Sequence, residues 1–127
     1  MPALDGFDTS QIRVGGQALS VAMADTPERR QQGLRSVESL PRGLEGMLFV
    51  FGESRPATFG MLDTLLPLDI WWFDADGRLV GATEMQPCPE EPCTAFASPG
   101  PVSWALETPL GAFDFEPGAQ LSTVENP

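Results

Sequence analysis

The chain has 127 residues, 42% of them hydrophobic, which suits one domain with a single core. Its 18 acidic residues outnumber 7 arginines, and the formal net charge of −11 disfavours binding to nucleic acid or to anionic membranes. The sequence contains no histidine and no lysine. This excludes serine or cysteine catalysis through histidine, histidine zinc sites and Schiff-base chemistry. No apolar run is long enough for a membrane-spanning helix, so membrane insertion is not expected.

The first residues lead into a predicted hairpin. Residues 1–10 are polar and are expected to form a flexible lead to one domain that spans residues 11–127. In the second half of residues 11–23, apolar and small side chains alternate with the period of a strand, and Gly15-Gly16 supplies the positive φ angles of a tight turn. The lead has no basic segment followed by an apolar one, so it does not have the pattern of a signal peptide.

A single short helix is predicted after this hairpin. Thr26 is a suitable N-cap, and Pro27 fits the first helical position, where a backbone N–H would have no partner. Asp25 is the alternative cap. The helix is expected to end near Gly33 and to dock on the sheet through Leu34.

The rest of the chain has the pattern of short strands joined by turns. The apolar run 46–51 is typical of a strand buried on both faces. Asp74–Gly77 is a predicted hairpin turn, residues 85–101 a long proline-rich loop, and residues 109–113 a single helical turn. Further strands are expected at residues 58–61, 68–73, 78–83, 102–107 and 119–124. These elements predict an α+β fold that is mainly β: a small antiparallel barrel or sandwich with one short helix packed on it.

Three carboxylates are candidate catalytic residues. Asp63, Thr64 and Asp69 lie within seven residues, and Pro67 bends the chain between them. Glu107, at the end of a predicted strand, would close the same site. Neighbouring carboxylates shift each other's pKa and can act as acid and base, or they can hold a cation with Thr64 as third ligand. The structural alternative is that Asp63 and Thr64 bond the backbone of a turn while Asp69 satisfies buried amides.

The two cysteines lie in the proline-rich loop. Cys88 and Cys93 have four residues between them, without the partners of a zinc site or the CxxC spacing of a redox pair. A disulfide is favoured, with free thiols, or a redox or metal role, as alternatives. A disulfide would place the protein in an oxidising compartment, the periplasm or the exterior, with the cytoplasm as the alternative. No metal site and no cofactor is predicted.

Adjacent tryptophans are candidate ligand-binding residues. Trp71 and Trp72 must point to opposite faces of their strand. One is expected in the core, and the other is either core on the second side of a barrel or exposed. An exposed tryptophan beside carboxylates would suit a sugar or a cationic ligand. Thr64, Trp71 and Trp72 are therefore the predicted ligand-binding set.

Five short segments, in a fixed order, carry a resemblance to a known family. They are ADTPE with QGL (residues 24–28 and 32–34), EGMLFVF (45–51), FGMLDT with PLDI (59–64 and 67–70), FDADGR (73–78), and the two Pro-Cys pairs with WALE (87–93 and 104–107). At this spacing, over residues 11–124, they resemble the uncharacterised family DUF192, also named UPF0127. The resemblance implies a small compact bacterial domain, often found behind a signal peptide, with no established activity.

One segment departs from the family pattern. The family usually has Phe-Trp-Met-Lys-Asn-Thr where this chain has Gly60, Leu62 and Asp63 in place of the tryptophan, lysine and asparagine. Arg35 stands where a methionine usually follows Gly-Leu. A family ligand site in these segments would therefore be altered or lost in this chain.

Three classes of function are consistent with the sequence. The leading expectation is a non-enzymatic, extracytoplasmic domain whose partner is a small ligand or another protein. The second is a carboxylate-based, hydrolase-like enzyme that uses Asp63, Asp69 and Glu107. The third is a structural or accessory module.

Overall fold

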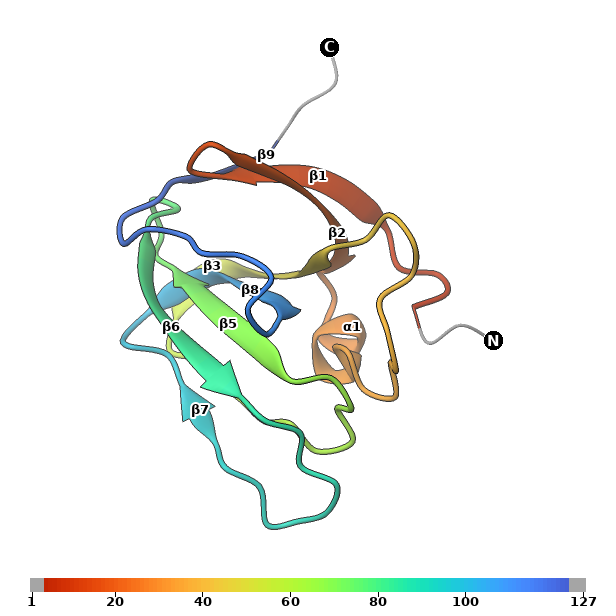
Figure 1. Cartoon of the computed structure of the whole chain (residues 1–127). Helices are drawn as coiled ribbons and strands as arrows, with labels where there is room; N and C mark the ends of the chain where they lie inside the picture. The colour runs from red at the N-terminus through yellow and green to blue at the C-terminus, as the bar shows by residue number, and fades with distance from the viewer. Residues whose placement is uncertain (1–3, 124–127) are drawn as a thin grey trace.

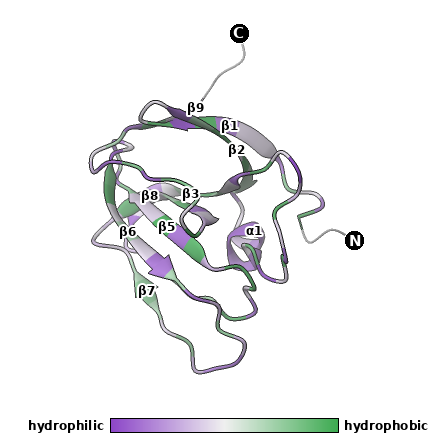
Figure 2. Ribbon diagram, viewed as in Figure 1, coloured by the Kyte–Doolittle hydropathy of each residue, from purple (hydrophilic) through white to green (hydrophobic). Residues whose placement is uncertain are grey.

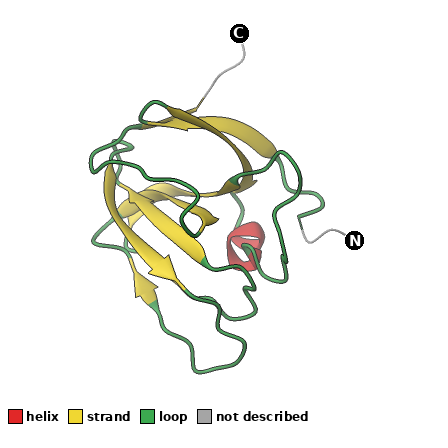
Figure 3. Ribbon diagram, viewed as in Figure 1, coloured by secondary structure: helices red, strands yellow, loops and turns green. Residues whose placement is uncertain are grey.

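The computed structural model describes residues 4–123 and shows a curled seven-stranded sheet, a two-stranded ribbon and one short helix (Figures 1 and 3). The predicted fold class, mainly β with a single helix, is confirmed. No helix within residues 4–123 is long and apolar enough to cross a membrane. The elements are β1 (Thr9–Val14), β2 (Gln17–Ala24), α1 (Pro27–Gln32), β3 (Gly46–Arg55), β4 (Thr58–Phe59), β5 (Leu68–Phe73), β6 (Leu79–Met85), β7 (Phe96–Ala97), β8 (Val102–Pro109) and β9 (Leu121–Thr123).

The first hairpin and the helix form where the sequence predicts them. β1 and β2 pair antiparallel around Gly15-Gly16, and Gly15 has the required positive φ of 61°. The side-chain oxygen of Thr26 accepts a hydrogen bond from the backbone N–H of Arg29 at 3.1 Å, and Pro27 occupies the first turn. α1 is largely hydrophilic (Figure 2) and has no buried residue, so the helix docks through Leu34, which is buried just after it.

One strand pair departs from the expected antiparallel arrangement. The sheet order is β6-β5-β8-β3-β2-β1-β9, and all neighbours are antiparallel except β2 and β3. These two are parallel because α1 and the loop after it carry the chain back along the sheet before β3 begins. This crossover places the end of α1 over β3.

The first part of β3 is buried on both faces, as its apolar run 46–51 predicts, and β5 and most of β8 are buried on both faces as well. Successive side chains alternate between two cores. The inner core fills the curl of the sheet and includes Leu48, Trp71 and Leu106. The outer core lies beneath Leu34 and the loops, and it includes Met47 and Trp72.

The two edges of the sheet meet at one end of the curl. The N–H of Leu79 donates to the carbonyl of Ala119 at 3.0 Å, and the N–H of Leu121 donates to the carbonyl of Gly77 at 2.8 Å. These bonds bring β6 and β9 together and give the sheet the shape of a half-barrel. They also pair backbone groups that an open sheet edge would leave exposed.

Two connections differ from the sequence prediction. The loop of residues 85–101 contains β7, which pairs with β4; two-residue strands are too short to produce a recognisable period. Residues 109–113 form a turn closed by the N–H of Ala112 on the carbonyl of Pro109 at 3.0 Å, and not a helical turn. The difference arises because β8 continues to Pro109.

At the ends of the described range, Leu4 is buried in the outer core and β1 begins at Thr9. The last strand, expected over residues 119–124, is β9 within residues 121–123, and Val124 lies outside the described residues.

Candidate functional site

A cavity of about 630 Å³ opens on the outer face of the sheet beside the end of α1. Its walls come from the end of α1 and the residues after it, β3 from Phe49 onward, the segment 56–64, residues 93–95 and one residue of β8. A cavity of this volume suits a small organic ligand.

Three arginine side chains line the cavity: Arg30 from α1, Arg35 from the loop after it and Arg55 from the end of β3. Nη1 of Arg30 donates to the carbonyl of Val50 at 2.9 Å, which holds this side chain along β3. The guanidinium of Arg55 lies over the ring of Phe51, 5.1 Å from its centroid. The Arg35 side chain is exposed and has no ion-pair partner within residues 4–123.

Negative charge is sparse around these arginines. Glu107 is the one acidic residue among the described residues that line the cavity. The exposed carboxylate of Glu53 lies 3.9 Å from Nη1 of Arg55, a distance and a setting in which an ion pair is weak. The cavity therefore concentrates positive charge in a chain whose net charge is −11.

Aromatic rings form the apolar part of the wall. Phe49, Phe51 and Phe59 line the cavity, and the ring of Phe59 meets Phe49 edge-to-face at 4.8 Å between centroids. Gly33 ends α1 with a φ of 51°, and a Cβ there would lie 3.4 Å from the Phe49 ring. That distance is an ordinary contact, so it is the positive φ that favours glycine at this helix end.

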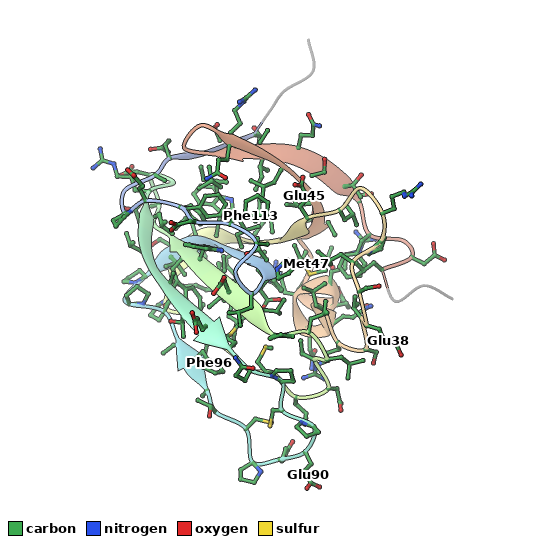
Figure 4. The ribbon with its side chains drawn as sticks, in the orientation of Figure 1. Glu38, Glu45, Met47, Glu90, Phe96 and Phe113 are labelled. Atoms are coloured by element: carbon green, nitrogen blue, oxygen red, sulfur yellow. A yellow bond between two sulfur atoms is a disulfide. The ribbon has the colours of Figure 1, made fainter. Side chains whose placement is uncertain are left out.

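Glu107 is the buried acid of the cavity, with only 4% of its surface exposed. It stands opposite Met47 of β3 and Ile70 of β5, both apolar; Met47 lies beside α1 in Figure 4. Burial raises the pKa of Glu107 from 4.5 to about 8. Within residues 4–123 its carboxyl has no hydrogen-bond or ion-pair partner. A Cβ at Gly46 would collide with the backbone oxygen of Glu107, so a glycine is needed where β3 approaches β8.

Asp69 does not join Glu107. It stands opposite Thr108 and Glu84, on the face of β5 that carries the inner core. Its Oδ2 accepts a hydrogen bond from the backbone N–H of Gly111 at 2.9 Å. Asp69 thus bonds a backbone amide, as the structural alternative has it, but this amide is exposed and not buried.

Asp63 does not line the cavity either, although its neighbours Leu62 and Thr64 do. It is exposed in a turn with a φ of 60°, where its N–H donates to the carbonyl of Cys88 at 3.3 Å and its carbonyl accepts from Ser36 at 2.9 Å. The convergence of Asp63, Asp69 and Glu107 that a carboxylate enzyme would require is therefore not found. No group of three or more acidic or cysteine side chains within residues 4–123 is placed to hold a metal ion.

Of the three predicted ligand-binding residues, the structure places only Thr64 on the cavity wall, where it is buried. Trp71 lies in the inner core, with Nε1 donating to Oγ1 of Thr108 at 3.0 Å. Trp72 lies in the outer core, edge-to-face with Phe59 at 5.4 Å between centroids. Both tryptophans are thus core residues, one on each side of the sheet.

Cys88 and Cys93 are joined by a disulfide, with their Cα atoms 5.9 Å apart. Cys93 lines the cavity, together with Thr94 and Ala95. Figure 4 shows Glu90 at the far end of this loop and Phe96 where the chain returns to β7. The disulfide thus closes the loop immediately before it reaches the cavity wall.

Sequence reasoning missed most of the cavity. None of its candidate site residues was an arginine. Arg29 of α1 forms an ion pair with Asp25 at 3.8 Å. Arg30 and Arg35 instead line the cavity. The one usable signal was Arg35, which departs from the family's methionine at that position.

Comparison with known proteins places the chain in a family. The family model DUF192, described as "Uncharacterized ACR", matches residues 10–123. A solved structure from Sinorhizobium meliloti, whose description suggests a transcription regulator, is 30% identical with a TM-score of 0.78 over 92% of this chain and 95% of that one. A protein of unknown function from Novosphingobium aromaticivorans is 26% identical with a TM-score of 0.77 over 93% of this chain and 87% of that one. A search of curated proteins finds no match. Since the family model spans nearly the whole domain, the chain belongs to the DUF192 family.

Proposed function

We propose that the chain is a small-ligand-binding domain whose cavity takes an organic anion. The observation that carries this proposal is the cavity of about 630 Å³ with Arg30, Arg35 and Arg55 on its wall. Arg30 and Arg35 have no carboxylate partner within residues 4–123, the partner of Arg55 is the exposed Glu53, and Glu107 is the one acid among the described residues of the lining. A bound carboxylate, phosphate or sulfonate would supply the missing negative charge.

The two kinds of wall suit the two parts of such a ligand. Guanidinium groups donate two parallel N–H bonds to a carboxylate or phosphate. The rings of Phe49, Phe51 and Phe59 offer an apolar surface to the ligand's carbon skeleton. The proposed ligand is therefore an anion with an apolar or aromatic body.

Binding is favoured over hydrolysis by paired carboxylates. A carboxylate pair requires two acids at one site, and Asp63 and Asp69 both lie away from the cavity that Glu107 lines. Direct DNA binding is not part of the proposal either, because the net charge of −11 opposes approach to a phosphate backbone.

The proposed location is the periplasm or the exterior of the cell. The Cys88–Cys93 disulfide supports this, because such bonds persist in oxidising compartments. Labelling of free thiols in freshly broken cells tests it. Two blocked cysteines are expected, and two reactive thiols would favour the cytoplasm.

Isothermal titration with a matched probe pair tests the proposed function. The anion 4-isopropylbenzoate is expected to bind at least about tenfold more tightly than the neutral 4-isopropylbenzyl alcohol, and added salt should weaken its binding. Arg35→Gln should weaken binding of the anion. Arg13→Gln, which changes an exposed arginine of β1 outside the cavity, should leave binding unchanged. Equal affinity for the two probes, or equal loss in the two variants, would contradict the proposal.

A further inference from the structure

Glu107 combines burial, access to the cavity and the absence of a protein partner. The residue is 4% exposed and lines the cavity, and its carboxyl makes no hydrogen bond within residues 4–123. Nε1 of Trp72 is the one fully buried side-chain nitrogen or oxygen without a partner among the described residues, so the Glu107 carboxyl is in contact with the cavity, where solvent or a ligand can bond it. A ligand oxygen at the inner end of the cavity would provide the partner that the protein does not.

We propose that Glu107 donates a hydrogen bond to an acceptor oxygen of the ligand, so that the cavity selects organic anions that also carry such an oxygen, as oxo acids do. This inference rests on the proposed function, because it requires an anion to be bound in the same cavity. It deepens that function by naming a specificity-determining residue and a narrower ligand class.

The position of the residues sets the direction of the ligand. Arg35 is exposed and Arg30 and Arg55 are half-buried, whereas Glu107 is buried against the sheet. The arginines therefore lie nearer the mouth of the cavity and Glu107 at its inner end. The anionic group of the ligand would face the arginines, and its acceptor oxygen would reach Glu107.

The charge state of Glu107 fits the role of donor. The side chains that face it from β3 and β5 are the apolar Met47 and Ile70, and the charged groups on the same cavity wall are the three arginines named above. Burial outweighs these cations and raises the pKa of Glu107 to about 8. Near neutral pH the carboxyl is therefore mainly protonated and can donate to a carbonyl oxygen. Above that pKa it is an anion and would repel the same oxygen.

A second matched pair of probes tests this role. 4-Acetylbenzoate and 4-isopropylbenzoate have nearly the same shape and the same carboxylate, but only the acetyl group carries an acceptor oxygen. At about pH 6.5 the wild-type protein is expected to bind 4-acetylbenzoate at least about fivefold more tightly. This preference should disappear by about pH 9.5, where Glu107 is ionised.

Two variants separate donation from simple packing. Glu107→Gln keeps an N–H donor that does not titrate, so it should retain the preference at both pH values. Glu107→Met keeps the volume without a donor, so it should bind both probes equally at both pH values. Thermal unfolding and far-UV circular dichroism of each variant confirm that the fold is retained.

The outcomes distinguish this inference from the proposed function. If the wild type binds the two anions equally at about pH 6.5, the role of Glu107 is overturned and the anion-binding cavity stands. If Glu107→Met keeps the preference, the role is also overturned. If neither anion binds the wild type at either pH, both the proposed function and this inference are overturned.

Discussion

Asp69 and Glu107 lie on opposite faces of the sheet, although their strands pair directly. The register of β5 and β8 sets Asp69 opposite Thr108 and sets Ile70 opposite Glu107. Because successive residues of a strand face opposite sides, this offset of one residue places the sheet between the two carboxylates. Glu107 therefore meets the cavity without a second acid, which favours ligand binding over two-carboxylate chemistry.

Glu107→Gln is expected to stabilise the protein more as the pH rises. The pKa of Glu107 is raised from 4.5 to about 8, so its contribution to stability is full below about pH 4.5 and is lost as the pH rises toward 8. Glutamine does not titrate, so the Glu107→Gln variant does not lose this stability as the pH rises. Urea unfolding at about pH 5 and about pH 8.5 should show the free-energy gap between variant and wild type widening by a few kcal/mol. Glu38→Gln, at an exposed position, serves as control. A gap that does not change with pH would refute the expectation.

Thr26→Ala is expected to destabilise the fold by about 1 kcal/mol, because it removes the acceptor for the backbone N–H of Arg29. Thr26→Ser keeps that acceptor and should recover most of the loss. Urea unfolding of the three proteins measures both effects. If serine and alanine cost the same, the hydrogen bond is not what stabilises the helix start.

Trp71→Phe should cost more than Trp72→Phe. Nε1 of Trp71 donates to the buried hydroxyl of Thr108, which phenylalanine would leave unpaired. Nε1 of Trp72 is buried without a partner in the described part of the chain, so phenylalanine removes an unsatisfied donor there. The expected difference between the two free energies of unfolding is about 1–2 kcal/mol. Equal losses of unfolding free energy in the two variants would contradict this expectation.

Opening the Cys88–Cys93 disulfide is expected to lower the free energy of unfolding by about 2 kcal/mol, since the bond closes a short loop and restricts the unfolded chain. The double variant Cys88→Ser with Cys93→Ser should have the same free energy of unfolding as the wild type measured in reductant. Reductant should not change the free energy of unfolding of the double variant itself, which controls for effects of the reductant elsewhere in the protein. A wild type that is equally stable with and without reductant would contradict the expectation.

Elements with strong local signals could be predicted from the sequence. Thr26 and Pro27 mark a helix start by their hydrogen-bonding chemistry, and Gly15-Gly16 marks a turn by its φ angles. The apolar run 46–51 correctly indicated a strand buried on both faces at the start of β3, and residues 68–73 form the strand β5 that was expected there. In each case the signal lies within a few neighbouring residues.

The cavity depends on long-range pairing, which leaves no local signal. Arg30, Arg55 and Glu107 meet because the β2–β3 crossover brings α1 over β3 and because β3 pairs with β8. Closeness in sequence instead suggested a site at Asp63 and Asp69, which the strand register separates from Glu107. Spacing along the chain indicates a shared site only when the register is also known.

An NMR titration of ¹⁵N-labelled protein with 4-isopropylbenzoate tests the central claim, an anion-binding cavity, most directly. The account predicts saturable shifts of backbone amides around the cavity, at Gly33, Phe51, Thr58 and Ala95, and of the arginine Nε–H groups. Ile12, on the far side of the half-barrel in the inner core, should not move. An absence of saturable shifts, or shifts gathered on β1 and β9 and not around the cavity, would contradict it.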